Sequence, residues 1–222
     1  MKKEQIIKVS VTGVFCALAF IMTAVLRFKV AHLSFDLKDT IIAIVSLMYG
    51  PLYGIICAAI VAFLEFFTVS DTGFYGLIMN FLSSATFTLL VGIVYKYKRT
   101  FSGAIIGVCL SVVGVCVVMS LANILITPLY IPTVDSKAVI AMIPTLLLPF
   151  NFCKALINAA ATVAIYKPVR GVLKKARVVT SSENTTVANQ YKSIIVFIVA
   201  AVIIAVTVFL LIKVMGGNIS FF

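Results

Sequence analysis

The chain has 222 residues, of which 63% are hydrophobic and 11% are charged, and its mean hydropathy is +1.20. This composition excludes a soluble domain, whose surface must be largely polar. The net charge of +11 would suit a nucleic-acid-binding protein. However, the basic residues lie between long uncharged runs, and attraction to an anionic membrane surface accounts for them without any nucleic acid.

Runs without a charged residue determine the predicted fold class. Each of five such runs is long enough to cross a bilayer, which takes about 20 helical residues. They cover residues 9–26, 40–64, 72–95, 100–134 and 193–212. The sequence therefore predicts an all-α, polytopic membrane bundle of six core transmembrane helices and one additional C-terminal transmembrane helix.

The breaks between and within the runs set the helix boundaries in chain order. Gly50-Pro51 interrupts the second run and separates a short helix from the next one. The sixth helix is expected to be broken near Pro144 and Pro149, because a proline disfavours helical geometry at the residue before it, here Leu148. The six core helices are predicted at residues 6–26, 39–49, 51–67, 74–95, 102–128 and 139–167.

The charges between the helices predict the topology. Basic residues gather at residues 2–8, 96–99 and 167–177, whereas most acidic residues lie elsewhere, at Asp36, Asp39, Asp71 and Asp135. By the positive-inside rule the basic clusters and the amino terminus are cytoplasmic. The prediction is a multi-pass protein of the cell membrane, with a six-helix domain at 1–177, a polar cytoplasmic linker at 178–191 and the extra helix at 192–214.

A lysine inside the sixth predicted helix is the strongest functional signal. An ionisable residue within a membrane-spanning helix is costly and usually functional. Asn151, Lys154 and Asn158 recur at i, i+3 and i+7, so they share one helical face. With Asn80 on the fourth helix and Asn123 on the fifth, Asn151 and Lys154 predict a polar site that opens to the outside within an apolar pocket. Asn158 lies a turn deeper and is interpreted as a helix-packing residue.

Other interpretations of these residues stay open at this point. Asn80, Asn123 and Asn158 are also suited to hydrogen bonds that only hold helices together. Lys154 could extend its ammonium outward to the membrane surface. Glu65, near the outer end of the third helix, is interpreted as an interface charge.

The sequence contains no motif for an enzyme. No G-x-x-x-x-G-K-[ST] phosphate loop, HExxH zinc motif or pair of carboxylates within one helix is present. The cysteines fall inside apolar runs, and His32 has no cysteine or histidine near it, so no metal site is predicted.

Four stretches resemble a known family, the substrate-binding S-components of energy-coupling factor (ECF) vitamin transporters, and within it the riboflavin-specific members. They are Leu-Ser-Phe-Asp-Leu-Lys-Asp at 33–39, Gly-Pro-Leu-Tyr-Gly at 50–54, Gly-Leu-Ile-Met-Asn-Phe at 76–81 and Leu-Pro-Phe-Asn-Phe-Cys-Lys at 148–154. The last stretch is the most specific, because it is similar to the family's Pro-Phe-Asn-x-x-Lys motif. The resemblance covers roughly residues 6–170.

This resemblance implies a six-helix bundle that holds riboflavin near its external face, under the loop that follows the first helix. Asn123, Asn151 and Lys154 fall on the family's ligand-contacting positions. The isoalloxazine ring offers an imide and an apolar edge, which amide, ammonium and apolar side chains can complement. The candidate substrate-binding residues are Asn151, Lys154, Asn123, Asn80, Asp39 and Leu33.

The resemblance also implies partners. S-components dock on a transmembrane coupling subunit that two cytosolic ATPases drive, and they use small residues of the first helix to do so. The nearest match to that pattern is Gly13-x-x-x-Ala17, a spacing that allows close helix approach. The expected protein is a non-enzymatic riboflavin carrier with no cofactor of its own. The alternatives are an S-component for another small heteroaromatic vitamin and a ligand-free membrane scaffold.

Overall fold

The structure is a computed structural model that describes residues 3–30, 33–68, 72–131, 133–175, 198–203, 205–207 and 219–221. His32, Asp71 and the predicted linker at 178–191 lie outside the described residues. Of the predicted helix at 192–214, the structure describes two helical stretches, residues 198–203 and 205–207.

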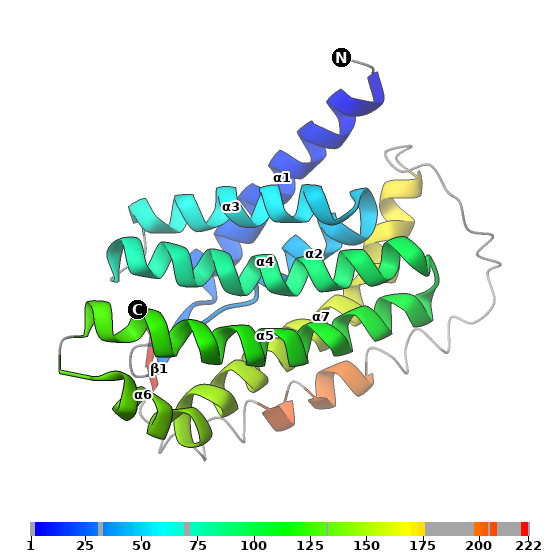
Figure 1. Cartoon of the computed structure of the whole chain (residues 1–222). Helices are drawn as coiled ribbons and strands as arrows, with labels where there is room; N and C mark the ends of the chain where they lie inside the picture. Colours follow the sequence, from blue (N-terminus) through cyan, green and yellow to red (C-terminus); the bar gives the residue numbers. More distant parts are fainter. Residues whose placement is uncertain are drawn as a thin grey trace.

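The described helices confirm the all-α prediction and follow the six predicted boundaries to within a few residues, except at the last helix (Figure 1). Five of the described helices are long and apolar enough to cross a membrane. The helices are α1 (Lys3–Val25), α2 (Lys38–Tyr49), α3 (Pro51–Thr68), α4 (Gly73–Tyr97), α5 (Phe101–Tyr130), α6 (Ser136–Met142), the π-helical segment η1 (Ile143–Leu147) and α7 (Leu148–Lys175).

The last core helix continues through Pro144 and Pro149, so the predicted break near them is wrong. Leu148 has right-handed helical angles, φ −67° and ψ −50°. The helix accommodates the prolines by widening into η1, where the Leu148 N–H bonds the carbonyl of Ile143 five residues earlier. A π-turn of this kind often marks a functional position within a helix. Because the helix is continuous, no new helix start forms at Pro149.

A small sheet, which the sequence did not predict, lies between α1 and α2. The strands β1 (Phe28–Val30) and β2 (Leu33–Phe35) form an antiparallel hairpin with Phe28 opposite Phe35. A third strand, β3 (Ile219–Phe221), pairs antiparallel with the other edge of β1. In the described part of the chain the strand order is therefore β2-β1-β3.

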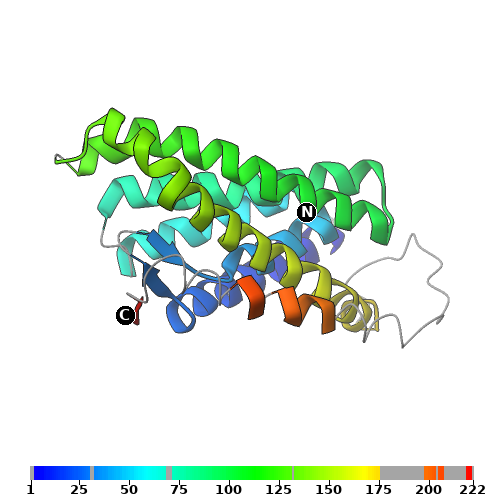
Figure 2. The same cartoon turned by 90° about the horizontal axis from the view of Figure 1, so that it is seen from below.

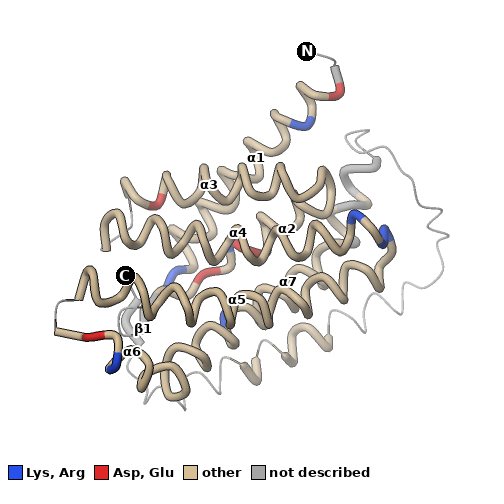
Figure 3. Tube along the Cα trace, viewed as in Figure 1, with Lys and Arg blue, Asp and Glu red and all other residues tan. Residues whose placement is uncertain are grey.

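The bundle has two ends, each formed by a different set of helix junctions. The start of α1, the α4–α5 junction and the end of α7 lie together at what we call the amino-terminal end (Figure 1). The hairpin and the α3–α4 and α5–α6 junctions lie at the opposite, hairpin end. The basic residues of the α4–α5 junction lie at the amino-terminal end (Figure 3).

The short helix α2 occupies the centre of the bundle. Nine of its 12 residues are buried, because α1 and α3 cover one side and α4 and α7 cover another. Ser46 on α2 donates a hydrogen bond to the carbonyl of Thr88 on α4 at 2.9 Å. A Cβ added at Gly54 or Gly92 would lie within 3 Å of Ser46. These glycines therefore let α3 and α4 approach α2 closely enough to enclose it.

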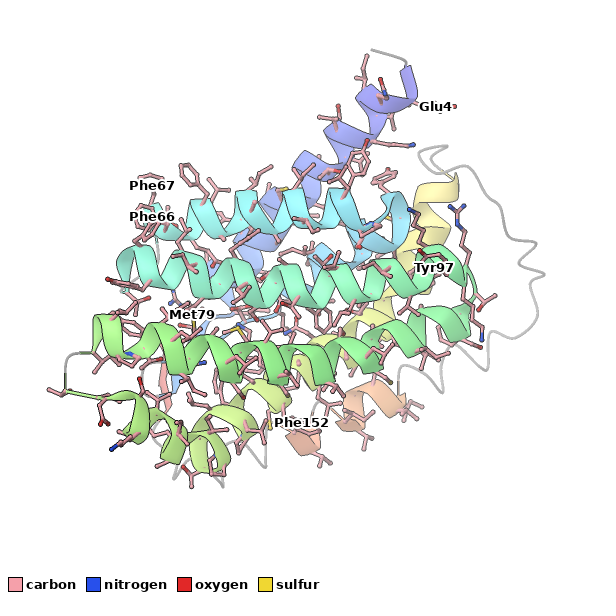
Figure 4. The ribbon with its side chains drawn as sticks, in the orientation of Figure 1. Glu4, Phe66, Phe67, Met79, Tyr97 and Phe152 are labelled. Atoms are coloured by element: carbon pink, nitrogen blue, oxygen red, sulfur yellow. The ribbon has the colours of Figure 1, made fainter. Side chains whose placement is uncertain are left out.

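The outer faces of the helices are apolar, as a lipid-facing surface requires. Val14, Phe63 and Leu125 are each more than half exposed. In Figure 4, the Phe67 side chain at the end of α3 points away from the bundle, whereas Met79 on α4 points toward its interior. The buried polar side chains therefore face the interior of the bundle, around the start of α2.

Candidate functional site

Lys154 extends into the bundle from α7 and contacts the segment between α1 and α2. Lys154 is 6% exposed. The ammonium nitrogen Nζ lies 3.0 Å from Oδ2 of Asp36 and 3.3 Å from the carbonyl oxygen of Ser34. The alternative in which this ammonium reaches outward to the membrane surface is therefore wrong. Lys154 instead ties α7 to the hairpin.

A second buried ion pair lies next to the first. Nζ of Lys38, at the start of α2, lies 2.6 Å and 2.8 Å from the two carboxylate oxygens of Glu65 on α3. The same nitrogen lies 3.7 Å from Oδ2 of Asp36, which joins the two pairs. Glu65 is 1% exposed. The interpretation of Glu65 as an interface charge is thus wrong, because Lys38 supplies a buried partner for it.

Asp39 adds a third carboxylate to this group. It accepts a hydrogen bond from the hydroxyl of Ser84 on α4. We use the term buried ion cluster for the five residues Asp36, Lys38, Asp39, Glu65 and Lys154, none of which is more than 6% exposed. If all five are ionised, three carboxylates face two ammonium groups. The first turn of α2 lies among them, and the positive end of its dipole favours the extra negative charge.

The first turn of α2 is held by a side chain from another helix. Oδ1 of Asn158 on α7 accepts hydrogen bonds from both the backbone N–H and the hydroxyl of Thr40, each at 2.9 Å. Its Nδ2 donates to the carbonyl of Asp36 at 3.0 Å. Asn158 is fully buried, and it satisfies a backbone N–H that the helix start leaves unpaired. The alternative that Asn158 joins helices is confirmed.

The ionisation of Asp36 follows from its neighbours. Burial by itself would raise the pKa of this carboxyl group, but the ammonium groups of Lys154 and Lys38 more than offset that effect. The pKa of Asp36 therefore lies below its ordinary value. Asp36 is a carboxylate at neutral pH, and it keeps a full counter-charge beside Lys154.

Two of the three candidate amides make hydrogen bonds within their own helix, whereas Lys154 reaches another segment of the chain. Nδ2 of Asn151 donates to the carbonyl of Leu147 at 2.8 Å. Asn123 on α5 donates to the carbonyl of Met119 and accepts from the hydroxyl of Thr127, so both of its bonds lie within its own helix. Asn80 is half-buried on α4.

The structure brings α4, α5 and α7 together beside these amides. Met119 and Ala155 belong to one buried apolar cluster, against which Met79 packs. These three residues are near neighbours in sequence of Asn123, Lys154 and Asn80. Leu33, the last candidate, lies in β2 opposite Val30 of β1. The candidate residues therefore come from helix faces and from the hairpin.

Three members of the buried ion cluster were not predicted as site residues: Asp36, Lys38 and Glu65. The first two lie in what the sequence presented as a charged external loop. The signal that could have identified them is the lysine itself, because a buried ammonium requires a buried counter-charge. Asp36 and Glu65 lie near the outer ends of predicted helices, where such a partner is expected.

Lys154 keeps one hydrogen-bond donor that could bind a ligand. An ammonium group carries three N–H donors, and Asp36 and Ser34 accept two from Lys154. The third remains for an acceptor such as a carbonyl. The arrangement suits recognition of a neutral polar group rather than catalysis, because both ammonium groups already have carboxylate partners.

Comparisons with known proteins agree with this architecture. The family model described as "ECF transporter, substrate-specific component" matches residues 8–166. The chain is 28% identical over 169 residues to the riboflavin transporter RibU of Staphylococcus aureus (strain TCH60), which covers 72% of this chain and 88% of that protein. It is 25% identical over 154 residues to the riboflavin transporter FmnP of Bacillus subtilis (strain 168), which covers 66% and 81%.

A solved structure shares the fold. It is described as the S component of a bacterial ECF transporter, and it superposes with a TM-score of 0.65 at 24% sequence identity. The match covers 77% of this chain and 99% of the solved one.

The Lys38–Glu65 pair gives a testable prediction about stability. Glu65→Leu alone removes the carboxylate that pairs with the buried ammonium of Lys38. Removing one partner of a buried ion pair typically lowers the free energy of unfolding by about 3–5 kcal/mol. The double variant Lys38→Met/Glu65→Leu removes both charges and should recover most of the lost thermal stability. Tm of the purified, detergent-solubilised protein measures both. A double variant that is less stable than Glu65→Leu would contradict a paired role.

Proposed function

Because the chain belongs to the family of ECF transporter substrate-specific components, we propose that it binds riboflavin and carries it across the membrane. It does so as a non-enzymatic, multi-pass membrane subunit of an ATP-driven transporter. The two curated relatives named above are both riboflavin transporters, and this supports riboflavin over other substrates.

The observation that carries the proposal is the position of Lys154. It belongs to the Pro-Phe-Asn-x-x-Lys stretch, is buried, and keeps one N–H donor that neither Asp36 nor Ser34 takes up. An isoalloxazine ring has carbonyl oxygens on either side of an imide N–H, so one of these oxygens can accept from that donor. The carboxylate of Asp39 and the amide of Asn151 offer acceptors for the imide N–H.

The rest of the ring requires an apolar surface, which the same region provides. Met79 on α4 and Met119 on α5 pack in the apolar cluster beside Ala155. Methionine side chains adapt their shape readily and make favourable contacts with aromatic rings. Asn80 and Asn123 stand next to these apolar positions and supply further hydrogen-bonding groups. The hairpin residue Leu33 completes the proposed site.

The choice among ligands rests on charge. A phosphorylated flavin needs cationic partners for its phosphate, and bidentate arginine is the usual one. The cations of the buried ion cluster, Lys38 and Lys154, already have carboxylate partners. Free riboflavin, which is neutral, therefore suits the site better than its phosphate. The vitamin is the transported ligand, and the proposal includes no cofactor.

Two other functions are distinguishable from this one. An S-component for a different heteroaromatic vitamin would show no riboflavin binding but would bind another compound of that class. A ligand-free scaffold would use the buried ion cluster only to hold helices. No added vitamin would then raise Tm, because only a ligand that binds the folded state stabilises it.

The proposed partners are a transmembrane coupling subunit and two cytosolic ATPases. Gly13 and Ala17 both lie on the exposed side of α1, and a Cβ added at Gly13 would meet no atom within 4 Å. This small-residue face is therefore available to another helix. The positive-inside rule assigns the amino-terminal end of the bundle to the cytoplasm, and the hairpin end then faces outside, where riboflavin arrives.

A riboflavin titration tests the binding site. Purified full-length protein should quench riboflavin fluorescence on binding, and Lys154→Met should weaken the affinity at least about tenfold, since a hydrogen bond to a charged group contributes about 1.5–3 kcal/mol. Lys137→Met, which alters an exposed lysine of α6, is the matched control and should bind as the wild type does. Wild-type affinity in Lys154→Met would remove this lysine from the site.

Substitution on α1 separates binding from transport. Gly13→Ile places a bulky side chain on the proposed docking face, so riboflavin uptake by cells that express the complete transporter should be largely lost. Riboflavin binding by the purified subunit should be unchanged, because Gly13 is exposed and a Cβ added there meets no other atom of the chain within 4 Å. Val14→Ile, on the next exposed position, is the control. Normal uptake in Gly13→Ile would place the coupling subunit elsewhere.

A further inference from the structure

Residues 198–221 lie beyond the segment that the family model matches, which ends at residue 166. Two parts of this C-terminal extension nevertheless contact the elements that build the site. The first contact is with α7, which carries Lys154. The second is with β1, in the hairpin whose other strand contacts Lys154.

The contact with α7 is made by small apolar side chains. Ala200 is 5% exposed and forms one buried cluster with Ala160 and Ala164, while Ile165 and Ile203 pack at its edge. Small residues of this kind let two helices approach closely within a membrane. In Figure 2 the two described helical stretches of the extension lie alongside α7. The extension is thus packed against the bundle at this point.

The contact with the hairpin is made by the backbone. β3 pairs with β1 so that Ile219 lies opposite Val30, Ser220 opposite Lys29 and Phe221 opposite Phe28. β2 occupies the other edge of β1. Strands of three residues form only a marginal two-stranded hairpin, and without β3 the outer edge of β1 would have unpaired backbone groups. β3 therefore stabilises the hairpin directly.

The hairpin in turn contacts the proposed ligand site. β2 contains Ser34, whose carbonyl accepts from Lys154, and Asp36 follows two residues later with the second contact. A continuous path of contacts therefore runs from β3 through β1 and β2 to Lys154. The extension holds both ends of this path, because Ala200 packs on the helix from which Lys154 projects.

We propose that the described stretches of the extension, residues 198–203, 205–207 and 219–221, act as a strap that positions the hairpin over the site and slows the release of bound ligand. The role of the strap in ligand release rests on the proposed function, whereas its pairing with β1 does not. A ligand held beside Lys154 leaves when the hairpin moves away. Loss of the β1–β3 pairing lowers the cost of that movement, so it should raise the dissociation rate.

Disulfide cross-linking tests the pairing without any ligand. Directly opposed residues of an antiparallel pair have Cα atoms about 5.5 Å apart or closer, which a disulfide can span. Lys29→Cys/Ser220→Cys should therefore form a link that peptide mass spectrometry identifies. In the control Ser34→Cys/Ser220→Cys, β1 separates the two strands by about two strand spacings, or about 9.6 Å. Equal linking in both variants, or none in the first, would overturn the proposal.

Riboflavin dissociation kinetics test the consequence. A chain that ends before Ile219 should release riboflavin about tenfold faster. The reason is that the loss of about two backbone hydrogen bonds lowers the free energy needed to open the hairpin. Ser220→Pro should act similarly, since proline cannot donate to a strand ladder. Ser220→Ala keeps the backbone N–H and should match the wild type.

The outcomes separate the two proposals. A cross-link at 29–220 without any riboflavin binding would remove the proposed ligand and leave the strand pairing intact. Riboflavin binding with unchanged dissociation rates in the truncated chain would overturn the strap and leave the proposed function intact.

Discussion

The ion pair between Lys154 and Asp36 is the interaction on which the rest of the site depends. A lone ammonium inside a membrane bundle is costly, and the carboxylate 3.0 Å away offsets that cost. Because the two residues come from α7 and from the segment before α2, the same pair also fixes the hairpin to the bundle. Lys38, Glu65 and Asn158 then complete the charges and hydrogen bonds that Asp36 and the start of α2 require.

This arrangement explains why α2 is short and central. Its first turn must reach the buried ion cluster, and its remaining residues fill the space between α1, α3, α4 and α7. Gly54 and Gly92 permit that enclosure by leaving room for Ser46. A bundle built in this way can hold polar groups far from lipid while its outer faces stay apolar.

The sequence predicted the helices well, because uncharged runs and the break at Gly50 mark them physically. It also identified Lys154 and Asn158 as residues of one face. It did not predict that Asp36, Lys38 and Glu65 are buried, since charges near a helix end normally face water. The β1–β2–β3 sheet was missed as well. Three-residue strands have no periodic pattern, and β3 comes from a segment almost 190 residues away.

The proline-containing helix shows a different limit. Pro144 and Pro149 correctly indicated an irregularity, but a π-turn between them absorbed it without a break. Asn151 bonds to the carbonyl of Leu147 at the end of this wider turn. The sequence located this irregularity. It could not show whether the helix would break or form a π-turn, because that depends on packing against neighbouring helices.

The central claim is that Asp36 positions Lys154 for the ligand, and one titration tests it most directly. Riboflavin fluorescence quenching is measured with purified wild-type protein and with Asp36→Asn, which keeps the side-chain shape and removes the charge. The account predicts about tenfold weaker binding for Asp36→Asn, since the loss of one charge-assisted contact to Lys154 is worth about 1.4 kcal/mol or more. Unchanged affinity in a folded Asp36→Asn variant would contradict the account.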